Sequence, residues 1–86
     1  MSGYTRLNPK IKTVTGTGTT TSTGALSLSG TFGLNYTKVV ILSACPTDRA
    51  GFVFYRGGDY IHCYEVGTFS PIANTSVPVE VAYADR

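Results

Sequence analysis

A pair of adjacent glycines, Gly57 and Gly58, separates two runs in which nearly every residue is aromatic or β-branched. Such runs favour extended strands, and a Gly-Gly pair between them supplies the positive φ angles that a tight two-residue turn requires. Residues 52–66 are therefore predicted to form a β-hairpin. With the two glycines as the whole loop, Tyr55 lies opposite Tyr60, and this pair sets the register of the hairpin.

This register divides the hairpin into two faces, because successive side chains of a strand point to opposite sides. One face is apolar and is predicted to join the core, since Phe, Ile and Cys gain little from contact with water. It carries Phe52, Phe54, Ile61 and Cys63. The other face combines large rings with polar tips and is predicted to be a binding surface or an interface. Its candidate residues are Val53, Tyr55, Tyr60, His62 and Tyr64.

Three roles stay open for this second face. It packs inside the fold, it forms an interface between copies of the chain, or it binds a glycan or a peptide. Tyr is enriched at subunit interfaces, and a charged fraction of only 14% favours association. Aromatic rings on a flat sheet also stack on sugar rings.

The composition argues against two classes of partner. The net charge is +2, which falls short of the clustered Lys and Arg that mark a nucleic-acid footprint. No apolar run approaches the ~18 residues of a membrane span, and the first residues lack the apolar stretch of a signal peptide. We therefore expect no nucleic-acid binding, no membrane insertion and no export signal.

Residue types that carry catalysis are sparse. His62 is the single histidine, and no acid shares its face of the predicted hairpin. The carboxylates show no paired spacing, and the possible metal ligands are not grouped. We therefore expect no enzyme activity, no metal and no cofactor. Cys45 and Cys63 are the two cysteines, and two buried thiols are expected in preference to a disulfide.

The rest of the chain shows strand and turn patterns without helical periodicity. Residues 15–24 consist of Thr, Ser and Gly and are predicted to form an exposed loop or a weak edge. Residues 26–29 predict a short strand, and residues 38–45 predict a central strand covered on both faces. A short strand is expected near Phe69, and residues 77–83 alternate as a final strand.

Six or seven short strands with turns between them predict an all-β domain, a small antiparallel β-sandwich or barrel with nearly no helix. We expect the domain to span residues 10–86 and residues 1–9 to form an N-terminal arm or linker. Pro78 has no N–H for a ladder, so it is expected at an edge or where pairing begins. The predicted core consists of Leu26, Leu28, Val39, Ile41, Phe52, Phe54, Ile61, Val77, Val79 and Val81.

The stretch LSLSGTFGLNYTKVVILSA, residues 26–44, is followed by short β-prone segments and an alternating apolar end. This pattern resembles the small β-sandwich modules of bacteriophage tail fibres and prophage tail-tip proteins, over residues 24–86. The resemblance implies a structural or receptor-binding role without chemistry, a homotrimer, and attachment to a cell-surface glycan. It also implies a virion component made in the bacterial cytoplasm. It assigns no role to an individual residue.

Two functions therefore stand as hypotheses. The first is a viral structural module that forms homo-oligomers through its tyrosine-bearing sheet, as a trimer or, given the prevalence of twofold assemblies, as a dimer. The second is a carbohydrate-binding module that acts as a monomer, which the absence of Trp disfavours. The mass of the protein in solution separates the two.

Overall fold

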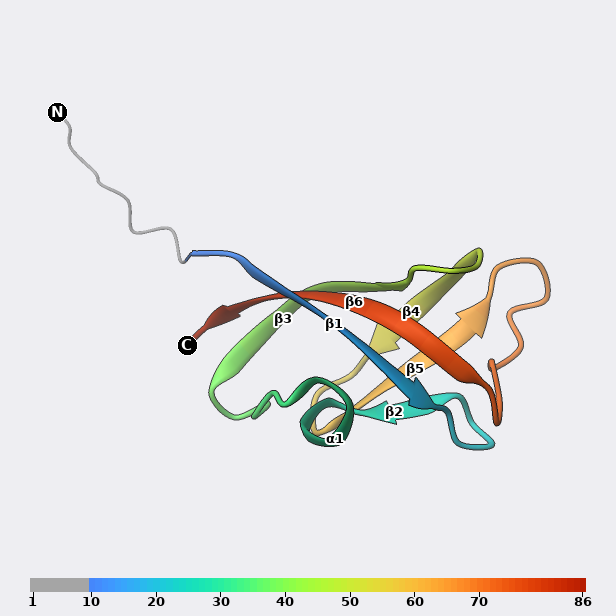
Figure 1. Ribbon diagram of the computed structural model, residues 1–86, viewed down its shortest axis with the longest axis horizontal. Helices are drawn as coiled ribbons and strands as arrows, with labels where there is room; N and C mark the ends of the chain where they lie inside the picture. The colour runs from blue at the N-terminus through green and yellow to red at the C-terminus, as the bar shows by residue number, and fades with distance from the viewer. Residues whose placement is uncertain (1–9) are drawn as a thin grey trace, which may run out of the picture.

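The computed structural model of the protein describes residues 10–86. Two antiparallel three-stranded sheets pack face to face around one hydrophobic core (Figure 1). This arrangement confirms the predicted all-β sandwich with nearly no helix. The arm predicted for residues 1–9 lies outside the described residues. In chain order the elements are β1 (Lys12–Thr19), β2 (Ala25–Ser27), α1 (Leu28–Phe32), β3 (Val39–Pro46), β4 (Gly51–Tyr55), β5 (Tyr60–Glu65) and β6 (Ser76–Asp85).

The first sheet has the order β1-β6-β3, and its middle strand β6 supplies much of the core. The alternation predicted for this segment is confirmed, since Val77, Val79 and Val81 are fully buried. Pro78 lies where the pairing with β3 ends, because Pro46, the last residue of β3, pairs with Val79. The missing N–H of Pro78 therefore falls outside the β3 ladder, as expected for proline.

Residues 38–45 do not form the predicted central strand, because β3 lies at the edge of its sheet. A bulge at Leu42 interrupts its pairing with β6, since Ile41 pairs with Tyr83 and Ser43 with Ala82. Leu42 remains 49% exposed. A continuous apolar run predicts burial on both faces, but β3 has a strand partner on one side only and part of it stays exposed, as Val40 and Leu42 show.

Of the two alternatives predicted for residues 15–24, the edge is the one found for residues 15–19, because they belong to strand β1 at the edge of its sheet. The predicted weak anchoring is wrong, since residues 12–19 pair with β6 in unbroken register. Thr and Gly alternate there, so the threonines face solvent and the glycines face inward. A Cβ atom on Gly16 would lie 2.5 Å from the carbonyl oxygen of Thr31 and 2.7 Å from the ring of Phe32. The inward glycines thus allow α1 to pack directly against the strand.

Helix α1 replaces the second half of the strand predicted for residues 26–29. The strand ends at Ser27, whose hydroxyl accepts a hydrogen bond from the N–H of Gly30 and caps the helix. Leu28 and Phe32, four residues apart, are both buried and anchor the helix to the core. Gly33 ends the helix in the left-handed conformation, with φ of 70°.

The second sheet has the order β2-β5-β4, and the predicted register of its hairpin is wrong by one residue. Tyr55 pairs with Ile61 instead of Tyr60, so residues 56–59 form the loop and Tyr60, the first residue of β5, has no partner on β4. Because side chains alternate along a strand, this shift exchanges the two faces of β4 and leaves the faces of β5 as predicted.

A contact between the loop and α1, which lies far away in the sequence, accounts for the longer loop. Gly57 and Gly58 both adopt positive φ angles, 105° and 81°. Asp59, however, binds the beginning of α1. Its carbonyl oxygen accepts from the N–H of Leu28 at 2.6 Å, and its carboxylate accepts from the hydroxyl of Ser27 at 2.7 Å. The turn residues alone do not encode this tertiary contact.

The predicted core is confirmed except at Ile41, Phe52 and Phe54. Ile41 is half-buried and packs against the core. The prediction that Phe52 and Phe54 are core residues is wrong, because both side chains lie on the outer face of β4. The helix and the loops add residues that strand alternation does not reach, Phe32, Leu34 and Ile72. The predicted core residues that are buried are Leu26, Leu28, Val39, Ile61, Val77, Val79 and Val81.

Two further expectations are corrected in the loops and the cysteines. Phe69 lies outside any strand, with φ of 57°, and pairing near it is a bridge between Tyr64 and Pro71. The two cysteines are not bridged. Cys63 is buried as predicted, whereas Cys45 is exposed on the edge strand β3.

Candidate binding surface

The outer face of the β4–β5 hairpin carries a continuous group of aromatic rings. Strand β5 turns its even-numbered residues outward, and the shifted register places two phenylalanines of β4 beside them. One ring from the loop after β5 completes the group. We call this group the aromatic face, which consists of Phe52, Phe54, Tyr60, His62, Tyr64 and Phe69.

Phe52 contacts two other rings of the aromatic face. Phe52 lies opposite Tyr64 and stacks on it, with ring centroids 5.4 Å apart and planes 14° apart. Phe69 meets the Phe52 ring edge-on, at 5.9 Å and 71°. Phe54 lies directly opposite His62. Directly opposite residues are neighbours in contact distance, so these side chains form one patch.

This patch is largely in contact with water. Phe69 is 69% exposed, Phe54 and Tyr60 are each 51% exposed, and Phe52 is 37% exposed. At roughly 200 Å² for a whole aromatic side chain, these fractions leave about 400 Å² of aromatic surface in water. The largest apolar patch of a typical monomer is of about this size and is often a functional surface.

The structure divides the predicted site residues into two groups. Tyr60, His62 and Tyr64 lie on the aromatic face. Val53 and Tyr55 do not, because the shifted register turns them inward, where they pack against the core. The Tyr55 hydroxyl also donates a hydrogen bond of 2.9 Å to a carbonyl oxygen of the hairpin loop. These two residues therefore support the fold beneath the surface.

Sequence reasoning missed Phe52, Phe54 and Phe69 as members of the aromatic face. A two-residue loop predicts that Phe52 and Phe54 face the core. The observation that contradicts such a loop is the contact of Asp59 with α1. No local pattern encodes that contact. Phe69 lies in a loop, where side-chain periodicity carries no information about burial.

Comparison with known proteins assigns no family. No protein-family model, curated protein or solved structure matches this chain.

Among residues 10–86, no three His, Cys, Asp or Glu side chains are grouped so that they could hold a metal ion. Lys12 pairs with Asp85 at 2.6 Å and Arg49 with Asp48 at 2.7 Å, both at the surface. No helix in the described part of the chain is long and apolar enough to cross a membrane.

Proposed function

We propose that this chain is a non-catalytic structural module of a phage or prophage tail that associates with copies of itself through the aromatic face. The observation that carries the proposal is the exposure of Phe54, Tyr60 and Phe69, each at least half in water although aromatic. Rings of this kind are enriched at subunit interfaces. The phage setting comes from the resemblance over residues 24–86.

Energetics indicate how much of the surface the contact needs. Covering about 400 Å² of apolar surface is worth roughly 10 kcal/mol at ~25 cal/mol per Å². Association costs about 4–15 kcal/mol in lost freedom of motion, so the aromatic face alone gives a marginal complex. A stable interface buries about 800 Å² per partner. The contact must therefore extend beyond the rings, for example to Val66, which is 50% exposed.

The proposal predicts the mass of the protein in solution. Through the aromatic face alone, the chain is expected to form an oligomer at micromolar concentration, a trimer by the resemblance. Replacing Phe54 and Tyr60 together by Ser is expected to lower the mass, because it removes two of the most exposed rings. Both side chains are half in water, so the β-sheet spectrum is expected to stay unchanged. Analytical ultracentrifugation and circular dichroism measure the two quantities.

A matched control comes from the other sheet. Val40 and Leu42 on β3 are 40% and 49% exposed, and replacing both by Ser removes similar apolar area away from the aromatic face. This control variant is expected to keep the wild-type mass. A wild-type chain that sediments as a monomer contradicts the proposal. It would favour the second hypothesis, a monomeric module that stacks its rings on sugars.

A further inference from the structure

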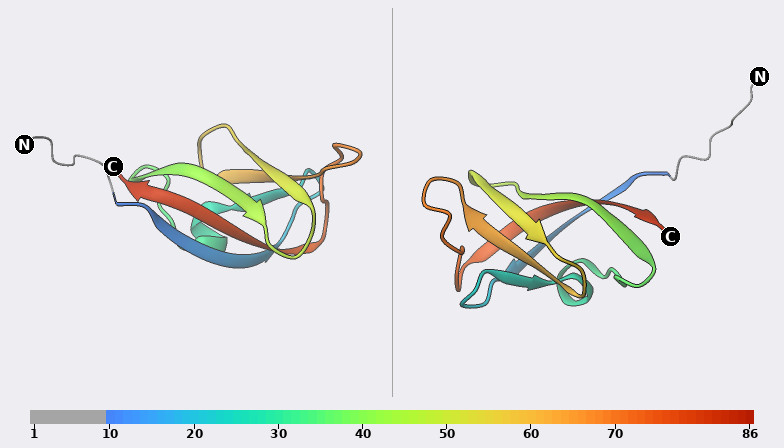
Figure 2. Two further views of the ribbon diagram at one scale, coloured as in Figure 1. Left: turned by 90° about the horizontal axis from the view of Figure 1, so that it is seen from above. Right: turned by 180° about the vertical axis from the view of Figure 1, so that it is seen from behind.

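The edges of the two sheets differ in how they are closed to further strands. Strand β2 has three residues, β3 carries a bulge at Leu42 and ends in Pro46, and β4 has five residues and lies against β3. Strand β1 has eight residues in unbroken register, without proline and with its single charge at Lys12. Proteins normally block edge strands by shortness, proline, bulges or charge. Among the described edges, β1 is the one left open, and no strand lies beyond it (Figure 2).

Half of the backbone groups of β1 face this open edge. The N–H of Thr20 donates to the carbonyl oxygen of Thr75 at 2.9 Å. Since the bonded residues of an antiparallel ladder alternate, this bond sets the phase, and the even-numbered residues of β1 bond to β6. The odd-numbered residues direct their N–H and C=O groups away from β6. They are Thr13, Thr15, Thr17 and Thr19.

We propose that β1 pairs with the β1 strand of a second copy of the chain, antiparallel and about a twofold axis. A register centred on Gly16 places Thr15 opposite Thr17 of the partner subunit, and Thr13 opposite Thr19 of the partner subunit. Every threonine of the open edge then donates one hydrogen bond and accepts one. Their exposed side chains also meet across the strands, and Thr–Thr pairs stabilise antiparallel sheets.

The charge pattern and the other edges favour a second copy in this twofold arrangement. The register places Lys12 opposite Thr20 of the partner subunit, so no like charges meet. In a cyclic assembly, β1 of one copy would instead pair with a different edge strand of the next copy, which would have to be β2, β3 or β4. These edges are short, bulged or covered. The twofold pairing joins the two β1-β6-β3 sheets into one continuous sheet.

This inference goes beyond the proposed function and uses a different surface. The aromatic face belongs to the β2-β5-β4 sheet, whereas the open edge belongs to the β1-β6-β3 sheet. An assembly that uses both contacts has an even number of copies. Each contact can be removed without touching the residues of the other.

The test replaces Thr15 by Pro, with Thr15→Ser as the matched control. Proline removes an N–H that faces the open edge and leaves the bonds to β6 in place, whereas serine keeps that N–H. We expect the mass of Thr15→Pro, measured by analytical ultracentrifugation, to be half that of the wild type. The serine variant is expected to keep the wild-type mass. Nuclear Overhauser contacts between Val14 and Val81, which pair in the wild type, check that the proline variant is folded.

Amide exchange gives a second readout that needs no variant. In the paired edge, the amides of Thr15 and Thr17 are expected to exchange at least 100-fold more slowly than unstructured amides. Rapid exchange of both amides in the wild-type assembly overturns the proposal. Equal masses for the wild type and the folded proline variant overturn it as well. If only the variant with Phe54 and Tyr60 replaced by Ser then has a lower mass than the wild type, the aromatic face is the contact between copies.

Discussion

Cys63 shows how burial alone changes the chemistry of a side chain. Its surface is entirely inaccessible to water. Loss of hydration raises the pKa of its thiol from the ordinary 9.0 to about 11, and the nearby charge of Arg49 opposes this shift. The thiol therefore stays protonated at neutral pH and is a poor nucleophile. Its role is that of a small apolar side chain in the core.

The pKa of Cys63 predicts that the protein loses stability as the pH rises from about 9 to about 11. In this interval the unfolded thiol ionises, while the folded thiol remains protonated until about 11. Ionisation therefore favours the unfolded state, and at ~1.36 kcal/mol per pKa unit the loss approaches roughly 2 kcal/mol. Urea denaturation at a series of pH values measures it. A Cys63→Ala variant provides the baseline, and an equally steep loss in that variant would assign the effect to other groups.

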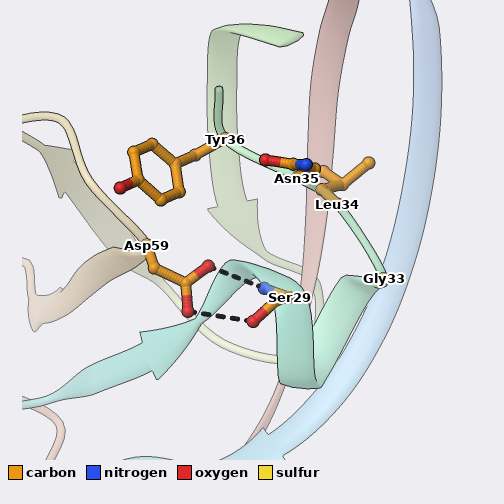
Figure 3. A pocket seen from close by; sticks show the side chains of 6 residues that line it. All are labelled: Ser29, Gly33, Leu34, Asn35, Tyr36 and Asp59. Carbon is orange, nitrogen blue, oxygen red and sulfur yellow. Dashed lines mark hydrogen bonds between the residues drawn. The ribbon is translucent and has the colours of Figure 1, made fainter. Parts of the chain in front are cut away.

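Asp59 connects the residue scale to the element scale. Its carboxylate accepts a hydrogen bond from the hydroxyl of Ser27. It also accepts hydrogen bonds from the N–H and the hydroxyl of Ser29 (Figure 3). These bonds, with that of Ser27 first, hold the pKa of Asp59 below its ordinary value. One residue of the hairpin loop thus stabilises the beginning of α1, and this contact fixes the length of the loop.

At the scale of elements, the contact between α1 and β1 depends on residues that lack a side chain. The space above Gly16 is filled by the carbonyl oxygen of Thr31 and the ring of Phe32. The neighbouring inward position, Gly18, faces the hydroxyl of Thr31 at 3.0 Å from an added Cβ atom. The helix can approach the strand this closely because neither position carries a Cβ atom.

Replacing Gly16 by Ala is therefore expected to destabilise the fold. The added methyl group would meet backbone at 2.5 Å, and overpacking of this kind costs about 1–3 kcal/mol. Gly67 offers a matched control, because nothing lies within 4 Å of an added Cβ atom there. Gly67→Ala is expected to change stability by less than about 0.5 kcal/mol. Chemical denaturation compares the variants, and a Gly16→Ala variant as stable as the wild type would show that α1 shifts freely.

At the scale of the whole molecule, the sandwich presents two surfaces with different chemistry. The aromatic face contributes mainly apolar area, and the hydrophobic effect is not directional. This face therefore favours association without fixing the geometry of the contact. The edge of β1 offers directed backbone hydrogen bonds, which fix a register. The two surfaces belong to different sheets, so a copy of the chain can use both at once.

The two contacts together make a prediction about the assembly as a whole. A variant that combines Thr15→Pro with Phe54→Ser and Tyr60→Ser is expected to be a folded monomer, because neither contact remains. Each partial variant is expected to have an intermediate mass. Native mass spectrometry over a range of concentrations compares the combined variant and the two partial variants with the wild type. A combined variant that still forms oligomers would point to a contact elsewhere, such as the exposed Val40 and Leu42 of β3.

Several features of the fold follow from the sequence alone. The alternation of Val77, Val79 and Val81 identifies a strand with one buried face, because side chains of a strand alternate between its two sides. The pair Gly57-Gly58 identifies the hairpin, since both residues need positive φ angles that glycine adopts without steric cost. From such local signals the all-β class and the burial of Ile61, Cys63, Val77, Val79 and Val81 could be predicted.

Tertiary contacts decided the rest. The hairpin register depends on Asp59, which reaches the beginning of α1 and lengthens the loop by hydrogen bonds that no turn residue encodes. That shift alone moved Phe52 and Phe54 from the core to the candidate surface. Residues 15–19 form a paired strand because β6, distant in the sequence, pairs with them residue by residue. A local pattern specifies the conformations available to a segment, whereas the neighbouring segments select one of them, since burial and hydrogen bonding depend on partners distant in the sequence.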